Sequence, residues 1–269
     1  MTRVCICFYG MVQRSLKYTL RSIEHNIFQI LKNNRIEYDI YLHTYDASIS
    51  NSSRSSEYNV PIDVNDYKLL QPTSYIIESY DDFNNNFNFK AFTEQYKDPW
   101  NNNYESFINW IREMNSHSEV TKLWENKKDI YNFCLYLRAD LMYVTPLPVQ
   151  YIMNNLCNHN NVLFTVPWGK YQGLNDLIGI GNCDVMIVWG KRLQYLHEYL
   201  ATIGNNSEQH VKYVCDKHNV INIDLPMLFY RMRANGFKSY EAWKDPLFND
   251  LKDQCIRDGG EINDNFEPI

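Results

Sequence analysis

A buried strand, an amphipathic helix and a second strand follow one another at the start of the chain. Residues 3–10 read RVCICFYG, an unbroken apolar run that ends in a glycine and is typical of a strand covered on both faces. In residues 11–34, apolar side chains recur at spacings of three and four, which predicts an amphipathic helix. These side chains are Leu16, Leu20, Ile23, Ile27 and Ile30. Residues 37–46, EYDIYLHTYD, predict the second strand, and this order indicates a parallel pair in an α/β fold.

Strand and helix patterns continue to alternate along the chain. We expect strands over 73–80, 130–140, 161–169 and, in short pieces, 220–236. Helices are expected over 104–129, 146–156 and 207–219, the last with Ser207 as its N-cap. Polar segments over 47–59 and 81–103 predict a surface loop and an Asn-rich excursion, and 173–204 predicts a glycine-containing loop, a strand and a helix.

These patterns predict a single α/β domain with a mostly parallel, twisted sheet flanked by helices. Residues 1–236 would form the main body, and residues 237–269 a C-terminal appendage packed on the same domain.

Composition excludes several classes of function. The net charge of −6 argues against a broad nucleic-acid interface, although a local basic pocket for an anionic ligand remains compatible with it. No apolar stretch approaches about 20 residues, so we expect no membrane span. The seven cysteines are odd in number and lack zinc spacing, which favours reduced thiols. With a strand directly at the N-terminus, we expect a cytoplasmic protein, in the host cytoplasm if the protein is viral.

Charged residues interrupt the apolar stretch LYLRADLMYVTPLP, residues 135–148, at the end of an expected strand. Burying the charges of Arg138 and Asp140 is costly unless they have partners. One interpretation is a structural ion pair that closes a strand end. The other is a functional site, in which Asp140 holds Mg²⁺ or Mn²⁺ against a diphosphate. The residues by themselves leave both interpretations open.

Two other strand ends carry polar groups. In GMVQR, Gly10 permits a turn into a helix N-terminus and Arg14 offers donors to an anion, although an ordinary turn with an exposed arginine is the alternative. In HTYD, Thr44 and Asp46 suit a ribose or a base edge, but the start of a polar loop explains them as well. Because ligands of parallel sheets bind at the carboxyl ends of strands, we expect these residues to share one crevice with Arg138 and Asp140.

The segment GLNDLIGIGN, residues 173–182, combines three glycines with Asn175 and Asp176. Its glycines allow close approach of a ligand, and Asp176 suits a general base or a partner for sugar hydroxyls. A turn that needs these residue types is the alternative. Glu208, in the first turn of an expected helix, is a second acid, although acidic residues stabilise helix N-termini without any other role.

The order of GMVQRS, YDIYLHTYD, YLRADLMY, GLNDLIGIGN and SEQHVKYV resembles a group of small GT-A-type glycosyltransferases. Such proteins occur in bacterial surface-polysaccharide clusters and in large DNA viruses. The resemblance spans residues 3–236 and rests on the order and spacing of short motifs. It departs from the family at the Asp–x–Asp metal motif, where Arg138 replaces the first acid.

The resemblance implies a GT-A-like fold and a hexosyl- or pentosyltransferase that moves a sugar from a nucleotide-diphosphate-sugar, with UDP-sugars favoured, to a glycan acceptor. Asp140 would hold Mn²⁺ or Mg²⁺, and Asp176 and Glu208 would serve the chemistry. The nucleotide sugar would be bound by Gly10, Arg14, Thr44, Asp46, Arg138 and Asn175.

Two other functions remain open. A sugar-nucleotide nucleotidyltransferase would normally carry a Gly-rich signature near its N-terminus, whereas YGMVQRS has one glycine. A non-catalytic nucleotide- or glycan-binding protein would differ from an enzyme by forming no product.

Overall fold

The structure is a computed structural model that describes residues 2–202, 204, 206–239 and 244–269. Its centre is a seven-stranded sheet in the described part of the chain, in which only β9 runs antiparallel to its neighbours, β8 and β6. The strands in sheet order are β10 (Ile221–Asp224), β8 (Val162–Thr165), β9 (Gly179–Gly181), β6 (Phe133–Arg138), β1 (Arg3–Tyr9), β2 (Glu37–Tyr45) and β5 (Ser74–Glu78). The expected α/β fold with a mostly parallel sheet is confirmed.

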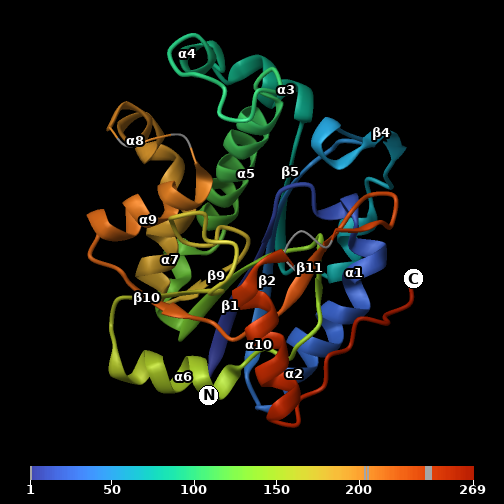
Figure 1. Ribbon diagram of the computed structural model, residues 1–269, viewed down its shortest axis with the longest axis vertical. Helices are drawn as coiled ribbons and strands as arrows, with labels where there is room; N and C mark the ends of the chain where they lie inside the picture. Colours follow the sequence, from blue (N-terminus) through green and yellow to red (C-terminus); the bar gives the residue numbers. More distant parts are fainter. Residues whose placement is uncertain (1, 203, 205, 240–243) are drawn as a thin grey trace.

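Helices cover both faces of this sheet. In Figure 1, α1 and α2 lie on one side of the sheet, and α5, α7 and α9 lie on the other. The α-helices are α1 (Leu16–Ile23), α2 (Gln29–Asn33), α3 (Tyr80–Asn86), α4 (Lys90–Thr93), α5 (Glu105–Lys122), α6 (Val149–Asn158), α7 (Cys183–Gly190), α8 (Leu196–Thr202), α9 (Ser207–Lys217) and α10 (Pro246–Arg257). Among the described residues, no helix combines the length and the apolarity that a bilayer-spanning segment needs.

Strand β1 is buried on both faces, as its apolar run predicts. Val4, Ile6 and Phe8 enter the core shared with α1 and α2, while Cys5 and Cys7 enter the core shared with α5, α7 and α9. All seven cysteines are free. Because successive side chains of a strand point to opposite faces, one apolar strand stabilises both helical layers.

A π-helical turn, Glu24–Phe28, interrupts the amphipathic helix expected over 11–34. The buried Asn26 lies in this turn. Its side-chain amide donates to the carbonyl of Tyr143 (2.7 Å), and its carbonyl accepts from the N–H of Leu147 (2.9 Å). The wider turn therefore fixes the helix to the chain that follows β6.

Residues 47–59 form a hairpin instead of the expected surface loop. Strand β3 (Ile49–Ser52) pairs antiparallel with β4 (Glu57–Pro61). The hairpin is anchored by the fully buried Glu57, whose carboxylate pairs with Arg14 and accepts from the backbone N–H of Ala234. The segment lacks an apolar pattern because a charge pair, rather than a hydrophobic face, holds it in place.

Two other expectations are corrected. The N-cap of α9 is Asn206 rather than Ser207, because the Asn206 side chain accepts from the N–H of Gln209 (3.0 Å). Part of the expected loop over 173–182 is β9, which lies inside the sheet. The Asn-rich excursion contains α3 and α4, which pack on α5 through phenylalanines such as Phe83 and Phe92.

A second, three-stranded antiparallel sheet joins the C-terminal part to the main body. Its order is β12 (Lys238–Ser239), β11 (Phe229–Met232) and β7 (Leu141–Tyr143). The boundary expected after residue 236 thus falls between two paired strands. Farther along, Phe248 of α10 is buried against Trp168, with ring centroids 5.1 Å apart.

Gly181→Ala should destabilise the fold by about 1–3 kcal/mol, the usual cost of overpacking. A Cβ at this position would lie 2.3 Å from the carbonyl oxygen of Val162 in the neighbouring strand, which cannot move without disturbing the sheet. Urea unfolding gives the change in free energy. Gly204→Ala is the control, because its nearest obstacle is the flexible side chain of Gln209 at 3.3 Å. Equal stabilities of the two variants would contradict this account of β9.

Candidate functional site

Three strand ends meet at one edge of the central sheet. Tyr9 at the end of β1 lies opposite Arg138 at the end of β6, and β2 runs parallel on the other side. The chain leaves β1 at Gly10, whose φ of +84° favours glycine and whose N–H donates to Ser116 Oγ at 2.7 Å. Gly10, Asp46 and Arg138 line one cavity of about 540 Å³. The three strand exits therefore reach one cavity, whereas Thr44, which was expected to share it, is not among its lining residues.

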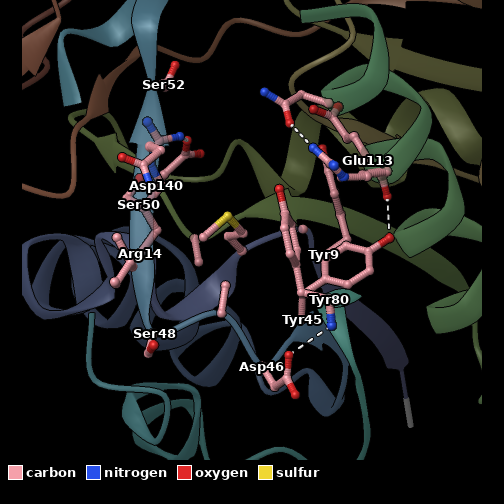
Figure 2. A pocket seen from close by; sticks show the side chains of 18 of the residues that line it. Tyr9, Arg14, Tyr45, Asp46, Ser48, Ser50, Ser52, Tyr80, Glu113 and Asp140 are labelled. Atoms are coloured by element: carbon pink, nitrogen blue, oxygen red, sulfur yellow. Dashed lines mark hydrogen bonds and ion pairs between the residues drawn. The ribbon is translucent and has the colours of Figure 1, made fainter. Parts of the chain in front are cut away.

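The cavity is bounded by the β3–β4 hairpin on one side and by α5 with its neighbours on the other. Figure 2 shows Arg14, Ser50 and Asp140 on one side of the view, and Tyr9 and Glu113 on the other. The hairpin that the sequence did not predict therefore supplies a wall of the site.

Arg138 joins two carboxylates at the floor of the site. Its Nε and Nη2 donate to the two oxygens of Asp140 at 2.8 and 2.9 Å, and its Nη1 donates to Glu113 Oε2 at 2.6 Å. Burial by itself would raise the pKa of Asp140, but the charge and hydrogen bonds of Arg138 outweigh it and lower that pKa. Burial raises the pKa of Glu113, and the charge of Arg138 opposes this rise.

The surroundings of Asp140 do not fit a divalent cation. Both of its oxygens accept from Arg138, and Arg14 Nη1 lies 3.9 Å from Asp140 Oδ2. Within the described ranges, no group of three or more His, Cys, Asp and Glu side chains is arranged to hold a metal. Mg²⁺ and Mn²⁺ need oxygen ligands, whereas the groups around Asp140 are mainly guanidinium donors. The arrangement is that of the ion pair, the alternative that the sequence left open.

Of the other expected site residues near the N-terminus, Arg14 and Asp46 line the first cavity and Thr44 does not. Arg14 lines the cavity while it holds Glu57. Asp46 also lines the cavity, and its carboxylate accepts from the N–H of Tyr80 at 2.8 Å. Thr44 is buried beneath the turn, where its hydroxyl accepts from the N–H of Val12 (3.2 Å), and it is not among the residues that line either cavity. Thr44 thus supports the turn that follows β1.

A second cavity, of about 650 Å³, adjoins the first and contains the two acids expected to serve chemistry. The two cavities share Arg14, Arg138 and Glu113. The lining of the second cavity includes both Asp176 and Glu208. The arginine-bearing wall therefore separates a space at the strand ends from a space that holds the acids.

Asn175 and Asp176 are adjacent but are held differently. Both ends of the Asn175 amide form hydrogen bonds within the loop: Nδ2 donates to the carbonyl of Trp168 (3.1 Å), and Oδ1 accepts from the N–H of Leu177 (3.0 Å). The carboxylate of Asp176 has no hydrogen bond or ion pair with any other residue in the described part of the chain. Asn175 thus shapes the loop, and Asp176 remains available to a ligand.

Glu208 faces Asp176 from the first turn of α9. Burial, with the negative charge of Asp176 adding to it, raises the pKa of Glu208 to about 8. The contact between the loop and α9 is tight, because the N–H of Leu174 donates to the carbonyl of Glu208 (3.0 Å) and a Cβ on Gly173 would lie 2.1 Å from that carbonyl. One acid of the pair is therefore protonated at neutral pH.

Sequence reasoning missed two charged residues of this site. Arg231 lies in β11, opposite Leu141 of β7, and lines the second cavity. The sequence pattern that identified Arg138, a charge within an apolar run, also marks Arg231, which interrupts the run LFYRM. Glu113 belongs to α5, where a charged residue is indistinguishable in sequence from the exposed face of a helix.

No protein-family model and no curated protein matches the sequence. Three solved glycosyltransferase structures show a distant likeness. Mouse xyloside xylosyltransferase 1, in its apo form, is 11% identical with a TM-score of 0.41 over 84% of this chain and 85% of that chain. A glycosyltransferase involved in glycosylation of the major capsid of PBCV-1 is 13% identical with a TM-score of 0.42, over 83% and 82% of the two chains.

The third structure, galactosyltransferase LgtC in complex with donor and acceptor sugar analogs, is 14% identical with a TM-score of 0.39, over 81% of this chain and 72% of that chain. Identities this low and TM-scores below 0.5 support no conclusion about the activity of this chain.

Asp140→Asn should lower the free energy of unfolding by about 3 kcal/mol or more, because it leaves the buried Arg138 without its main partner. Urea unfolding measures this change. Asp184→Asn is the matched control, since Asp184 pairs with Lys128 on the surface and its side chain is 79% exposed. We expect the control to change stability by less than about 1 kcal/mol. Similar effects of the two variants would contradict a buried pair.

Glu208→Gln tests the raised pKa. Between the ordinary value of 4.5 and the folded value of about 8, the folded protein holds one more proton at this site than the unfolded chain. The contribution of Glu208 to stability therefore decreases as the pH rises through this window. Gln does not titrate, so the difference in unfolding free energy should shift in favour of the variant between about pH 5 and 8. A difference that is constant with pH would show an ordinary carboxylate.

Proposed function

We propose that this protein is a GT-A-like glycosyltransferase, a hexosyl- or pentosyltransferase that moves a sugar from a nucleotide-diphosphate-sugar to a hydroxyl of a glycan. A UDP-sugar is the first donor to test. The observation that carries the proposal is the wall of arginines shared by the two cavities, with an unpaired carboxylate in the far one. Such a wall suits a ligand with an anionic centre and groups that extend to both sides.

The first cavity suits the nucleotide part of the donor. It lies at the carboxyl ends of parallel strands, where α/β proteins bind ligands, and its volume of about 540 Å³ is in the range of small-molecule sites. Asp46 and the ring of Tyr80 offer a polar edge and an aromatic face to a nucleoside. The diphosphate would then reach Arg14 and Arg138, whose planar forks match phosphate oxygens.

The second cavity suits the sugar and its acceptor. Its lining includes Trp100 and Tyr171, whose flat faces suit the apolar face of a sugar ring. Asp176 and Glu208 add a carboxylate and, at neutral pH, a protonated carboxyl that can donate a hydrogen bond. This combination offers both apolar contact and hydrogen bonds to hydroxyl groups.

Sugar transfer breaks the bond between the anomeric carbon and the terminal phosphate oxygen, and forms a bond from that carbon to the acceptor oxygen. Negative charge grows on the departing nucleoside diphosphate, where the arginines stabilise it. In a reaction that inverts the anomeric centre, Asp176 accepts the proton of the acceptor hydroxyl. In a reaction that retains configuration, Asp176 orients the sugar. Glu208 is a poor base at neutral pH because it already carries a proton.

The expectation that Asp140 binds Mn²⁺ or Mg²⁺ is not carried into this proposal. Both oxygens of Asp140 accept hydrogen bonds from Arg138, so no step is assigned to a cation there.

Two other functions are distinguished by their products. A nucleotidyltransferase would release pyrophosphate from a nucleoside triphosphate and a sugar phosphate, whereas a glycosyltransferase releases a nucleoside diphosphate. A binding protein would release neither. Release of free nucleoside diphosphate from UDP-, GDP-, CDP- or dTDP-sugars identifies a glycosyltransferase, and release of pyrophosphate from nucleoside triphosphates with sugar phosphates identifies a nucleotidyltransferase. A binding protein gives neither result.

Asp176→Asn should lower kcat by about 100-fold or more while leaving donor affinity nearly unchanged, because a general base acts in the chemical step. Nucleoside diphosphate release and calorimetric donor binding give the two quantities. Asp253→Asn, on the exposed face of α10, removes the same charge far from the cavities and should have no effect. Normal turnover in a folded Asp176→Asn protein would exclude Asp176 as the base.

A further inference from the structure

We infer that Arg14, Arg138 and Arg231 form a diphosphate site that works without a divalent cation, with Arg231 as the contact nearest the sugar. This inference rests on the proposed function, because it concerns how the donor of that reaction is held. It follows from the position of Arg231, from its missing partner and from the charges around Asp140.

The backbone fixes Arg231 beside Asp140. Strand β11 pairs with β7, and Arg231 is opposite Leu141, the residue that follows Asp140. The N–H of Met232 donates to the carbonyl of Asp140 at 2.7 Å. Because strand pairing sets the register on both sides of this point, Arg231 cannot shift along the sheet without breaking these bonds.

The guanidinium of Arg231 lacks an acceptor. In the part of the chain that the structure describes, it forms no hydrogen bond and no ion pair, whereas Arg138 bonds two carboxylates. Arg231 lines the second cavity and is only partly exposed. Burial, with the charge of Arg138 adding to it, lowers the pKa of Arg231, while Asp140, Glu113 and Asp176 oppose this change. A guanidinium in such surroundings is stabilised by an anion that enters the cavity.

The other two arginines also keep donors in reserve. Arg138 uses three of its N–H groups on Asp140 and Glu113, and a guanidinium has five. Arg14 pairs with Glu57 through Nη2, while its buried Nε has no hydrogen-bond partner. Both residues line the two cavities, so their guanidinium groups lie at the wall where the diphosphate would sit.

Charge decides between the arginines and a metal at this wall. A divalent cation on Asp140 would have to share oxygens that already accept from Arg138, and it would lie near three guanidinium groups. Like charges at such separations repel strongly in a partly buried site. A diphosphate has the opposite charge and would accept from all three arginines, with the acids keeping them oriented.

The test is calorimetric titration of the full chain with inorganic pyrophosphate and with UDP, in EDTA and again in Mn²⁺. We expect binding in EDTA, with affinities that agree within about threefold between the two conditions. Arg231→Gln should weaken binding of both ligands by about tenfold or more, the scale of a hydrogen bond to a charged group. Arg231→Lys should fall between, because it keeps the charge and loses the planar fork.

Arg21→Gln is the control, since Arg21 is an exposed residue of α1 and its loss changes the net charge by the same amount. Its affinities should equal those of the wild type, and melting temperatures should show that all variants are folded. Binding only in Mn²⁺, or unchanged affinity in Arg231→Gln, would overturn the arginine site. Mn²⁺-dependent sugar transfer would do so while leaving the proposed function intact. Binding in EDTA without transfer from any donor would instead count against the proposed function alone.

Discussion

The hydrogen-bonded pair of Arg138 and Asp140, whose side chains are 16% and 7% exposed, is the interaction on which the site depends. Arg138 ends the central strand β6, and Asp140 opens the turn into β7, so the pair connects the large sheet to the small one. Glu113 brings α5 to the same guanidinium. A buried charge is costly without its partner, so the loss of either residue would strongly destabilise the fold. The surrounding elements therefore have little freedom to rearrange.

Glu113 stands between two arginines. Arg138 forms an ion pair with it, and the charge of the fully buried Arg192 also acts on it. His117 and His210 lie near Arg192, and burial lowers the pKa of each, so both remain neutral at physiological pH. The negative charge of Glu113 thus offsets the positive charges of Arg138 and Arg192 on the α5 side of the cavity.

Backbone contacts, rather than side-chain packing alone, set the distance between the two halves of the site. The loop that carries Asp176 contacts α9 so closely that only glycine fits at residue 173. Strand β9 contacts β8 equally closely at Gly181. Both contacts hold carboxylates and strand ends at fixed separations. A site that must position two reacting groups needs such fixed separations.

The sequence by itself determined the α/β class, most of the strands and the three polar strand ends. Hydrophobic periodicity and the polarity of strand ends are local properties that can be read from neighbouring residues. Apolar runs located β1, β2 and β6, and the charges in RAD located the floor of the site. Local pattern failed where a distant partner decides the structure. Only the tertiary structure revealed the hairpin anchored by Glu57, the position of Glu113 and the unpaired Arg231, since each depends on contacts between segments far apart in the chain. It also decided between the two interpretations of Asp140, because whether a carboxylate faces arginines or a metal depends on which side chains the fold brings to it.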